Sequence, residues 1–323
     1  MAKILLIRFS SIGDIVLTTP VIRCLKLQLK GAEVHYLTKK AFSPVLEANP
    51  YIDKIHKIEK KLEEVIPDLK SENFDYIIDL HHNLRSNLIR LLIKKPCFTF
   101  NKLNLEKWLL VNFKINRLPP LHIVDRYMEA VKMLGVVNDN RGLDYFIPAK
   151  EEVHSASLPE THRQGYIGFV IGGQHATKRL PTEKIISVCG KIEKPVVLLG
   201  GKEDGETAAK IVAVIGKDKI YNACGKYNIN QSASLIKQAD KIITNDTGLM
   251  HIAAAFKKDI VSIWGNTLPE FGMYPYMPGA NSKIMEVKNL SCRPCSKLGY
   301  SKCPKKHFYC MNLQDETGVA GSL

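Results

Sequence analysis

Apolar runs and amphipathic segments alternate along the first half of the chain. Five short apolar runs predict β-strands, at residues 3–9, 33–38, 54–58, 74–80 and 97–100. Between the first two, apolar residues recur with helical spacing from Ile15 to Leu29, and Gly31 is placed to end that helix. Pro20 lies inside this segment, so the helix is expected to kink or to begin again there. A further helix is predicted over 123–134.

The same alternation begins again after the polar segment 150–164, which predicts a linker. Strands are expected at 166–173, 195–201, 220–223, 241–244 and 259–265, with helices at 181–192, 204–215 and 231–239. This order indicates an α/β protein of two Rossmann-like domains, residues 1–155 and 156–323, facing across a cleft at the carboxyl ends of the strands. Residues after Gln314 are expected to form a frayed tail.

Composition narrows the class of protein. The 323 residues are 45% hydrophobic and 24% charged, which suits globular domains. No apolar run approaches the roughly 20 residues of a spanning helix, and the first run resembles a strand more than a signal peptide. We therefore expect a cytoplasmic protein. Its net charge of +14 favours anionic ligands or a lipid surface, whereas no nucleic-acid-binding signature accompanies the scattered lysines.

The stretch RFSSIGDIVLTTP, residues 8–20, joins the first strand to the first helix. Gly13 allows a close backbone approach, and Asp14 stands at the start of the helix. From spacing alone, Asp14 either complements the helix dipole or faces the cleft as a base for an incoming hydroxyl group.

Strand-to-helix junctions in the second half carry further candidate residues. In TNDTGLMHIAAA, Thr247 and Gly248 would offer a hydroxyl and backbone N–H groups to a phosphate, and His251 lies one turn later. Lys178 in IGGQHATKRLP would balance a diphosphate charge. In LGGKEDGE, Glu203 or Asp204 would hold ribose hydroxyls, unless this is a plain surface turn. Neither a GxGxxG fingerprint nor a Walker A lysine is present.

Two other segments contain functional residue types. Arg85, in IIDLHHNLRSN, is suited to clamp a carboxylate or phosphate. Cys292, Cys295, Cys303 and Cys310 lie in CRPCSKLGYSKCPKKHFYC, whose opening C-x2-C fits a structural zinc site. His307 is a substitute ligand, and reduced free thiols or, less favoured in a cytoplasmic protein, disulfides are the alternatives.

Taken together, the motifs resemble those of glycosyltransferase family 9, the heptosyltransferases of lipopolysaccharide core assembly. KILLIRFSSIGDIVLTTPVIRCLK resembles the amino-terminal signature of that family, and ITNDTGLMHIAAAF resembles its donor-binding signature. TKRLP resembles a Lys-x-aromatic-Pro segment, although Leu180 replaces the commoner aromatic residue. Gly172, Gly173 and Gln174 stand where hydroxyl residues often precede the lysine. These differences bear on the identity of the donor more than on the type of reaction.

The resemblance implies a glycosyltransferase-B fold and an inverting transfer of heptose, or a related sugar, from a nucleoside diphosphate such as ADP. Asp14 would be the general base. The expected donor-binding residues are Lys178, Thr247, Gly248, Leu249, His251 and Glu203, and the expected acceptor-binding residues are Arg8, Ser11 and Arg85. No cofactor is expected for catalysis, since Lys178 and the helix beginning near Thr247 would balance the leaving diphosphate.

The partners implied are a nucleotide-sugar donor and an anionic lipid-linked glycan acceptor, without nucleic acid. The positive charge further fits peripheral contact at the inner face of the inner membrane. Two other functions remain open at this stage. A nucleotide-sugar 2-epimerase shares the architecture, and a non-catalytic nucleotide-sugar-binding protein would keep the donor site without turnover.

Overall fold

A computed structural model describes residues 2–323 and divides the chain into two compact units. The first unit contains the chain up to Lys102 together with Leu121–Pro148, and the second contains Leu103–Pro120 and Ala149–Leu323. The sequence had suggested a single boundary at 155/156. The extra segment 103–120 groups with the second unit, where Lys114 Nζ donates a hydrogen bond of 2.7 Å to the Pro294 carbonyl. No helix among the described residues is long and apolar enough to cross a membrane.

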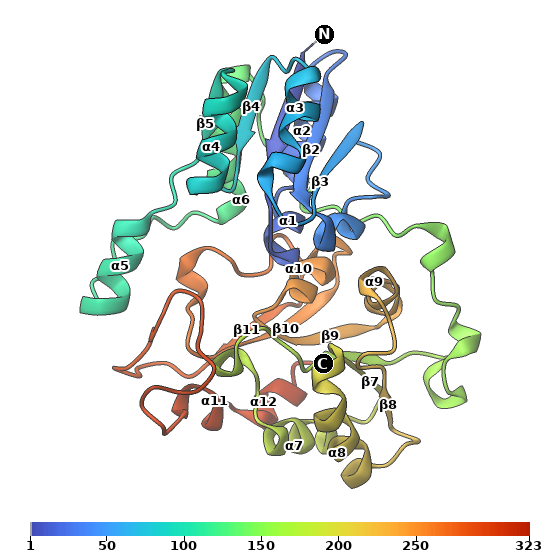
Figure 1. Ribbon diagram of the computed structural model, residues 1–323. Coiled ribbons are helices and arrows are strands. Elements are labelled where there is room, and N and C mark those ends of the chain that lie inside the picture. The colour runs from blue at the N-terminus through green and yellow to red at the C-terminus, as the bar shows by residue number, and fades with distance from the viewer. Residues whose placement is uncertain (1) are drawn as a thin grey trace. The chain divides into compact units, whose positions relative to one another are not determined.

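The first unit is built on a five-stranded parallel sheet in the order β3-β2-β1-β4-β5 (Figure 1). Its strands are β1 (Lys3–Ile7), β2 (Glu33–Lys39), β3 (Lys54–Ile58), β4 (Tyr76–Asp79) and β5 (Cys97–Thr99). Its helices are α1 (Ile12–Val16), α2 (Thr19–Gln28), α3 (Ile66–Ser71), α4 (Leu84–Ile93) and α6 (Ile123–Met128), with 3-10 turns η1 (Lys40–Val45), η2 (Leu62–Glu64) and η3 (Glu129–Leu134). Leu5, Ile7 and Ile77 of the sheet pack in one core with Ile89 of α4 and Leu69 of α3.

The helix predicted over 15–29 is two helices, because the chain starts a new helix at Thr19 with Pro20 in its first turn. Proline has no N–H to donate, and the first turn of a helix is where that loss costs nothing. The helix predicted over 123–134 is α6, continued by the 3-10 turn η3.

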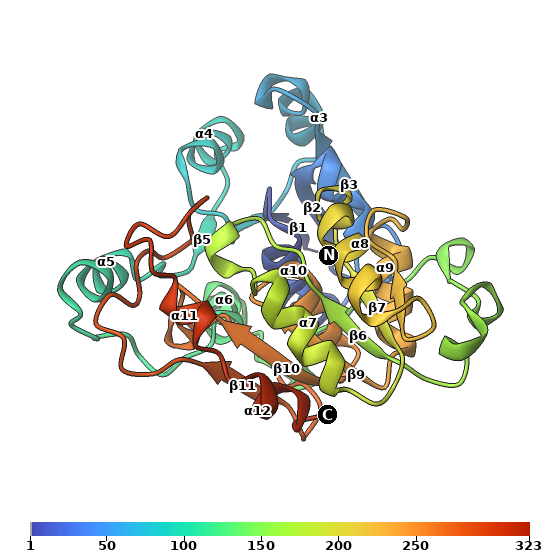
Figure 2. The same cartoon turned by 90° about the horizontal axis from the view of Figure 1, so that it is seen from below.

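The second unit is built on a six-stranded parallel sheet in the order β11-β10-β9-β6-β7-β8. Its strands are β6 (Ile167–Val170), β7 (Val196–Leu199), β8 (Ile220–Asn222), β9 (Lys241–Asn245), β10 (Asp259–Trp264) and β11 (Lys283–Glu286). Its helices are α5 (Asn104–Phe113), α7 (Thr182–Lys191), α8 (Gly205–Ile215), α9 (Ile229–Gln238), α10 (Gly248–Ala255), α11 (Tyr309–Asn312) and α12 (Glu316–Ala320). Helices α7, α8 and α12 cover one face of this sheet, and α9 and α10 cover the other (Figures 1 and 2). Both units are thus Rossmann-like α/β structures.

Six short 3-10 turns complete the second unit. They are η4 (Ala149–Glu151), η5 (Ser155–Ser157), η6 (Glu160–His162), η7 (Ala176–Lys178), η8 (Lys202–Asp204) and η9 (Pro269–Phe271). The first three lie in or beside the segment that the sequence predicted as a linker.

The carboxyl-terminal residues are not a frayed tail, contrary to the prediction from sequence. The Asp315 carboxylate accepts a hydrogen bond from the Gly318 N–H and so begins α12. Val319 is only 1% exposed within the core of the second unit, and Glu316 forms an ion pair of 2.6 Å with Lys184 of α7. A buried valine and an ion pair anchor this helix. The helix was not predicted because a segment of five residues is too short to show helical periodicity.

Candidate functional site

The β1–α1 junction holds one carboxylate in a fixed position. Ser11 caps α1, and both its backbone N–H and its hydroxyl donate to Asp14 Oδ2, at 3.2 and 2.8 Å. The other oxygen, Oδ1, lies 2.7 Å from the guanidinium of Arg8. The Asp14 side chain keeps 21% of its surface exposed, so a ligand can reach it.

Arg8 is a fixed cation beneath this carboxylate. Its Nε donates to the Ser10 carbonyl at 2.8 Å and its Nη1 to the Leu80 carbonyl at 2.6 Å, and its side chain is 11% exposed. Burial lowers the pKa of Arg8, but the charge of Asp14, the neighbouring tyrosines Tyr127 and Tyr36 and the hydrogen bond to Asp14 together outweigh that effect, so the pKa is raised overall. Arg8 therefore remains charged and orients the carboxylate.

The electrostatics of the junction keep Asp14 ionised. Burial of the carboxyl group raises its pKa, but the charge of Arg8 and the hydrogen bonds from Ser11 outweigh that effect, so the pKa of Asp14 lies below its usual value. An ionised, partly exposed carboxylate at the carboxyl end of a parallel strand is placed where open α/β sheets bind ligands. Chemically, it can accept a proton or orient a hydroxyl group.

A hollow of about 510 Å³ lies near the carboxyl ends of β1, β2 and β3 in the same unit. Arg85, predicted from sequence to bind an acceptor, lines it. The other lining residues are Phe9, Lys39, Ile58, Glu59, Lys60, Lys61, Leu62 and Glu63. Four cationic side chains against two acidic ones favour an anionic ligand in this hollow.

In the second unit, the β9–α10 junction presents a helix N-terminus. Thr247 is the N-cap of α10 in extended conformation, and its side chain makes no capping hydrogen bond to the first turn. The Thr247 hydroxyl instead lies 3.4 Å from that of Thr244. Gly248 and Leu249 form the half-buried start of the helix, whereas His251 is 2% exposed. The first-turn N–H groups and the positive end of the helix dipole thus suit an anionic group.

Lys178 lies beside this helix start. Its ammonium group is 2.5 Å from the carboxylate of Asp246, and the hydroxyl of Thr267 donates to the same carboxylate oxygen at 2.9 Å. Sequence reasoning singled out Lys178 but not Asp246 or Thr267, which lie 68 and 89 positions away from it along the chain. A bound anion would compete with Asp246 for the lysine.

Close packing explains Gly172, the first of the two glycines that follow β6. A Cβ on Gly172 would lie 2.3 Å from Asp204 Oδ2, so only glycine fits at that position. Asp204 is 3% exposed, accepts a hydrogen bond of 2.9 Å from the Gly201 N–H and pairs with Arg179 at 3.1 Å. Glu203, the first of the two acids considered from sequence, is exposed to solvent.

The four carboxyl-terminal cysteines occupy one region of the second unit. Cys310 is buried, and the other three are half-buried. Burial raises the pKa of Cys310 to about 12, with further contributions from the other three thiols, and burial followed by the neighbouring thiols also raises that of Cys295. Within residues 2–323, however, the sulfurs do not converge on one point as the ligands of a bound ion would. Four cysteines, once deprotonated, are a donor set that Zn²⁺ would stabilise.

The cysteine segment is fastened directly to the turn that carries Lys178. The N–H of Tyr300 donates to the hydroxyl of Thr177 at 2.8 Å, and the N–H of Thr177 donates back to the Tyr300 carbonyl at 3.1 Å. Arg293 ties the same segment to the end of β10, through a hydrogen bond of 2.8 Å from Nη2 to the Thr267 carbonyl. The turn that carries Lys178 is thus hydrogen-bonded to the cysteine segment.

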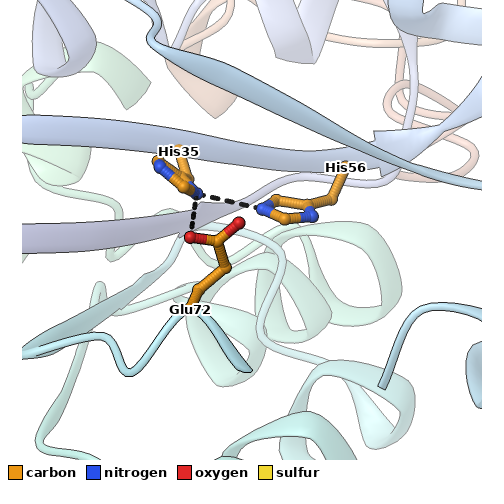
Figure 3. A group of neighbouring side chains, drawn as sticks. All are labelled: His35, His56 and Glu72. Carbon is orange, nitrogen blue, oxygen red and sulfur yellow. Dashed lines mark hydrogen bonds and ion pairs between the residues drawn. The ribbon is translucent and has the colours of Figure 1, made fainter. Parts of the chain in front are cut away.

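A second group with metal-binding side chains, His35, His56 and Glu72, lies in the first unit (Figure 3). Their three potential ligand atoms lie within 4.8 Å of one another. The ring nitrogens His35 Nδ1 and His56 Nε2 are 3.0 Å apart, and His35 Nε2 is 2.7 Å from Glu33.

Lysine side chains already satisfy the carboxylate of this group. Lys54 and Lys3 lie at 2.5 and 2.9 Å from Glu72, and their hydrogen bonds lower its pKa to about 2. Two ammonium groups would repel a divalent cation at the same carboxylate. We therefore interpret the group as a hydrogen-bonded structural network.

Comparisons with known proteins identify the family of the chain. The model of glycosyltransferase family 9 (heptosyltransferase) matches residues 63–305. Lipopolysaccharide heptosyltransferase 1 of Campylobacter coli is 26% identical over 293 residues, covering 82% of this chain and 84% of that protein.

Solved structures give the same picture of the fold. A family 9 glycosyltransferase from Veillonella parvula superposes with a TM-score of 0.78 at 24% identity, covering 99% of this chain and 96% of that one. ADP-heptose lipopolysaccharide heptosyltransferase II of E. coli gives a TM-score of 0.70 at 21% identity, over 96% and 98% of the two chains.

Proposed function

Because the chain belongs to glycosyltransferase family 9, and is therefore a glycosyltransferase, we propose that it transfers heptose from ADP-heptose to an anionic, lipid-linked glycan of the lipopolysaccharide core. The observation that carries this proposal is the Asp14 carboxylate, ionised and held by Arg8 and Ser11 at the edge of the first sheet. The family assignment favours transfer over epimerisation or mere binding. The names of the relatives support both heptose and ADP as the donor groups.

Asp14 acts as the general base in the proposed mechanism. An acceptor hydroxyl attacks the anomeric carbon of the heptose, the bond from that carbon to the diphosphate oxygen breaks, and the hydroxyl proton passes to Asp14. The configuration at the anomeric carbon inverts because the acceptor hydroxyl attacks from the face of the sugar opposite the leaving ADP. The low pKa of Asp14 makes it a weak base in the ground state, but the hydroxyl becomes acidic as its oxygen bonds to carbon.

The acceptor occupies the first unit in this scheme. Arg85 and the lysines of the 510 Å³ hollow bind its anionic groups. Arg8 and Ser11 were both expected from sequence to bind the acceptor. Both contact Asp14 and its loop, and Arg8 also donates to the Leu80 carbonyl, so we assign them the positioning of the base.

The donor occupies the second unit. The N–H groups at Gly248 and Leu249 and the ammonium of Lys178 take the developing charge of the diphosphate, and Asp246 releases Lys178 as the donor binds. These groups supply the positive charge that the departing ADP requires, so the transfer step needs no metal ion. Glu203 or Asp204 would hold the ribose, and His251 supports the start of α10 from its buried position.

We assign the four-cysteine segment a structural zinc ion. Cys292, Cys295, Cys303 and Cys310 would hold it as thiolates, and the ion would offset the burial and the neighbouring thiols that raise the pKa values of Cys295 and Cys310. Its contribution is to order the segment that clamps Thr177, not to take part in sugar transfer.

Calorimetric titration with ADP, UDP, GDP and CDP, with and without magnesium, tests the donor. We expect ADP to bind most tightly and magnesium to leave its affinity unchanged. The variant D14N, assayed with ADP-heptose and a core acceptor, should lower kcat by a factor of about 10² to 10⁴ while ADP affinity stays the same. Full activity of D14N would rule out Asp14 as the base, and preference for UDP would rule out the proposed donor.

A further inference from the structure

Helix α4 has two apolar sides, although only one of them is buried. Ile89 and Ile93 pack into the core of the first unit. Four leucines point away from that core, namely Leu84, Leu88, Leu91 and Leu92, with exposed fractions of 88%, 43%, 71% and 37%. At 3.6 residues per turn they fall within an arc of about 100°, whose centre lies about 130° around the helix axis from that of the isoleucines. A contiguous leucine stripe on a solvent-facing helix marks an interaction surface.

Cations border this stripe, and acids are absent from it. No aspartate or glutamate occurs between Asp79 and Glu106. The same segment contains Arg85, Arg90, Lys94, Lys95 and Lys102. On the helical wheel, Arg85 lies on one side of the leucines and Arg90 with Lys94 on the other, which is the arrangement of a helix lying in the interface of an anionic membrane.

A hollow of about 410 Å³ opens along the cationic border of α4. It is lined by His82, Asn87, Arg90, Leu91, Lys95 and Cys97. Arg90 and Lys95 make only neutral hydrogen bonds in this region, from Nη1 to Asn87 Oδ1 at 3.1 Å and from Nζ to Asn73 Oδ1 at 2.9 Å. Their charges are thus available to a phosphate group beside the leucines.

We propose that α4 docks the protein on an anionic phospholipid bilayer, with its four leucines entering the headgroup layer and Arg90, Lys94 and Lys95 binding lipid phosphates. A second copy of the chain is a poorer occupant, because a symmetric contact would place the same cations against each other. The inference extends the proposed function, whose acceptor is lipid-linked, by naming the surface at which the enzyme meets its membrane.

Helix α5 of the second unit has a similar composition. Leu105, Trp108 and Phe113 are 64%, 52% and 59% exposed, and Lys114 follows them at the helix end. Aromatic side chains are favoured at the membrane interface. The pattern of α5 is consistent with a bilayer partner, but the test below concerns α4 alone.

Vesicle binding by the full-length protein tests the proposal. The probe is vesicles of phosphatidylethanolamine and phosphatidylglycerol, compared with vesicles of phosphatidylcholine alone. We expect binding to the anionic vesicles, weakened at least tenfold in the double variant L84Q/L91Q and made less salt-dependent in R90Q/K94Q. The matched control is L27Q, which removes a leucine that is 55% exposed on α2, and it should bind like the unaltered protein.

Two results would overturn the proposal. One is equal vesicle binding by L84Q/L91Q and the unaltered protein. The other is a dimer in sedimentation that L84Q/L91Q dissociates while vesicles remain unbound, which would assign the surface to a second copy. ADP titration and transfer to a delipidated core acceptor are run in parallel, and both should be unchanged in L84Q/L91Q. Failure of docking is thereby distinguished from failure of the proposed transferase function.

Discussion

At the scale of single residues, the contact between Arg8 and Asp14 decides how the proposed base titrates. The Arg8 guanidinium lies 2.7 Å from Asp14 and is the main cause of the low pKa of this carboxyl group. Without that charge, burial would dominate and the pKa of Asp14 would rise. The sequence motif places the two residues six positions apart but does not reveal this dependence.

The variant R8Q should therefore shift the acid limb of the activity profile to higher pH. In the unaltered enzyme Asp14 stays ionised through the physiological range, so kcat/KM should not fall until the pH drops below the ordinary range of an aspartate. The measurement is the pH dependence of transfer for both proteins, with S11A as a milder comparison that keeps the arginine. An unshifted limb in R8Q would mean that Asp14 is not the titrating base.

His56 makes the first unit sensitive to acid. Burial, followed by the charge of His35, lowers the pKa of His56 to about 4 from the ordinary value of 6.5, and its side chain is 4% exposed. The unfolded chain therefore binds a proton more readily between these two pH values, so the free energy of unfolding falls as the pH decreases. The contribution of neutral, buried His56 to the free energy of unfolding is complete above pH 6.5 and is lost as the pH falls towards 4.

This argument predicts a loss of about 2 kcal/mol in the free energy of unfolding between pH 7.5 and pH 5 through His56 alone. Urea unfolding monitored at several pH values measures it. The H56Q variant should be less stable at pH 7.5 but should lose less on acidification. An identical pH dependence in the two proteins would show that His56 is not the responsible group.

At the scale of elements, the cysteine segment and the turn of Lys178 act as one piece. Two hydrogen bonds between Tyr300 and Thr177 connect them, with Lys178 next in sequence. If zinc orders the cysteine segment, removing it frees Thr177 and lets Lys178 move away from the diphosphate. The consequence is a loss of donor affinity without any change in the residues that contact the donor.

We expect C295S, or treatment with a chelator, to weaken ADP binding about tenfold. Elemental analysis should find one zinc per chain in the unaltered protein and none in C295S. The control is C97S, which changes a half-buried cysteine of the first unit and should keep both zinc and ADP affinity. Unchanged ADP binding in metal-free C295S would show that the cysteine segment does not control donor binding by Lys178.

The elements that the sequence predicted have a clear pattern of apolar residues, and those that it missed lack such a pattern. The five strands of the first sheet and five of the second were expected within a few residues, because buried parallel strands appear as apolar runs. Helix α4 was missed because its solvent-exposed side carries leucines where an ordinary surface helix is polar. Strand β11 was missed because its edge position leaves Lys283 and Ile284 exposed.

Site residues divide in the same way. Asp14, Lys178 and Thr247 stand in short motifs next to strand ends, so local sequence was enough to single them out. Asp246 was not singled out, because only folding brings it to its partner Lys178, and for Asp204, which was considered together with Glu203, the contact with Arg179 was not foreseen. Contacts between segments so far apart in the chain have no local signature, and neither does the network of His35, His56 and Glu72.

At the scale of the whole molecule, the proposal assigns the two substrates to different units. ADP stabilises whatever unit binds it, by about 2.7 kcal/mol at a concentration one hundred times its Kd. Because each unit has its own sheet and its own buried core, this stabilisation should be confined to the second unit. Under the proposed assignment, nucleotide alone does not bind the first unit and should not slow its opening.

Hydrogen exchange measured with and without ADP should therefore slow most in 176–180 and in α10 (Gly248–Ala255), where the diphosphate is proposed to bind. The strands of the second sheet should follow with up to about a hundredfold slower exchange, if they open as one cooperative unit. Amides of β1 and α1, around Asp14, should remain unchanged. Protection centred on the first unit would reverse the assignment of donor and acceptor, because a ligand can only stabilise the conformations to which it binds.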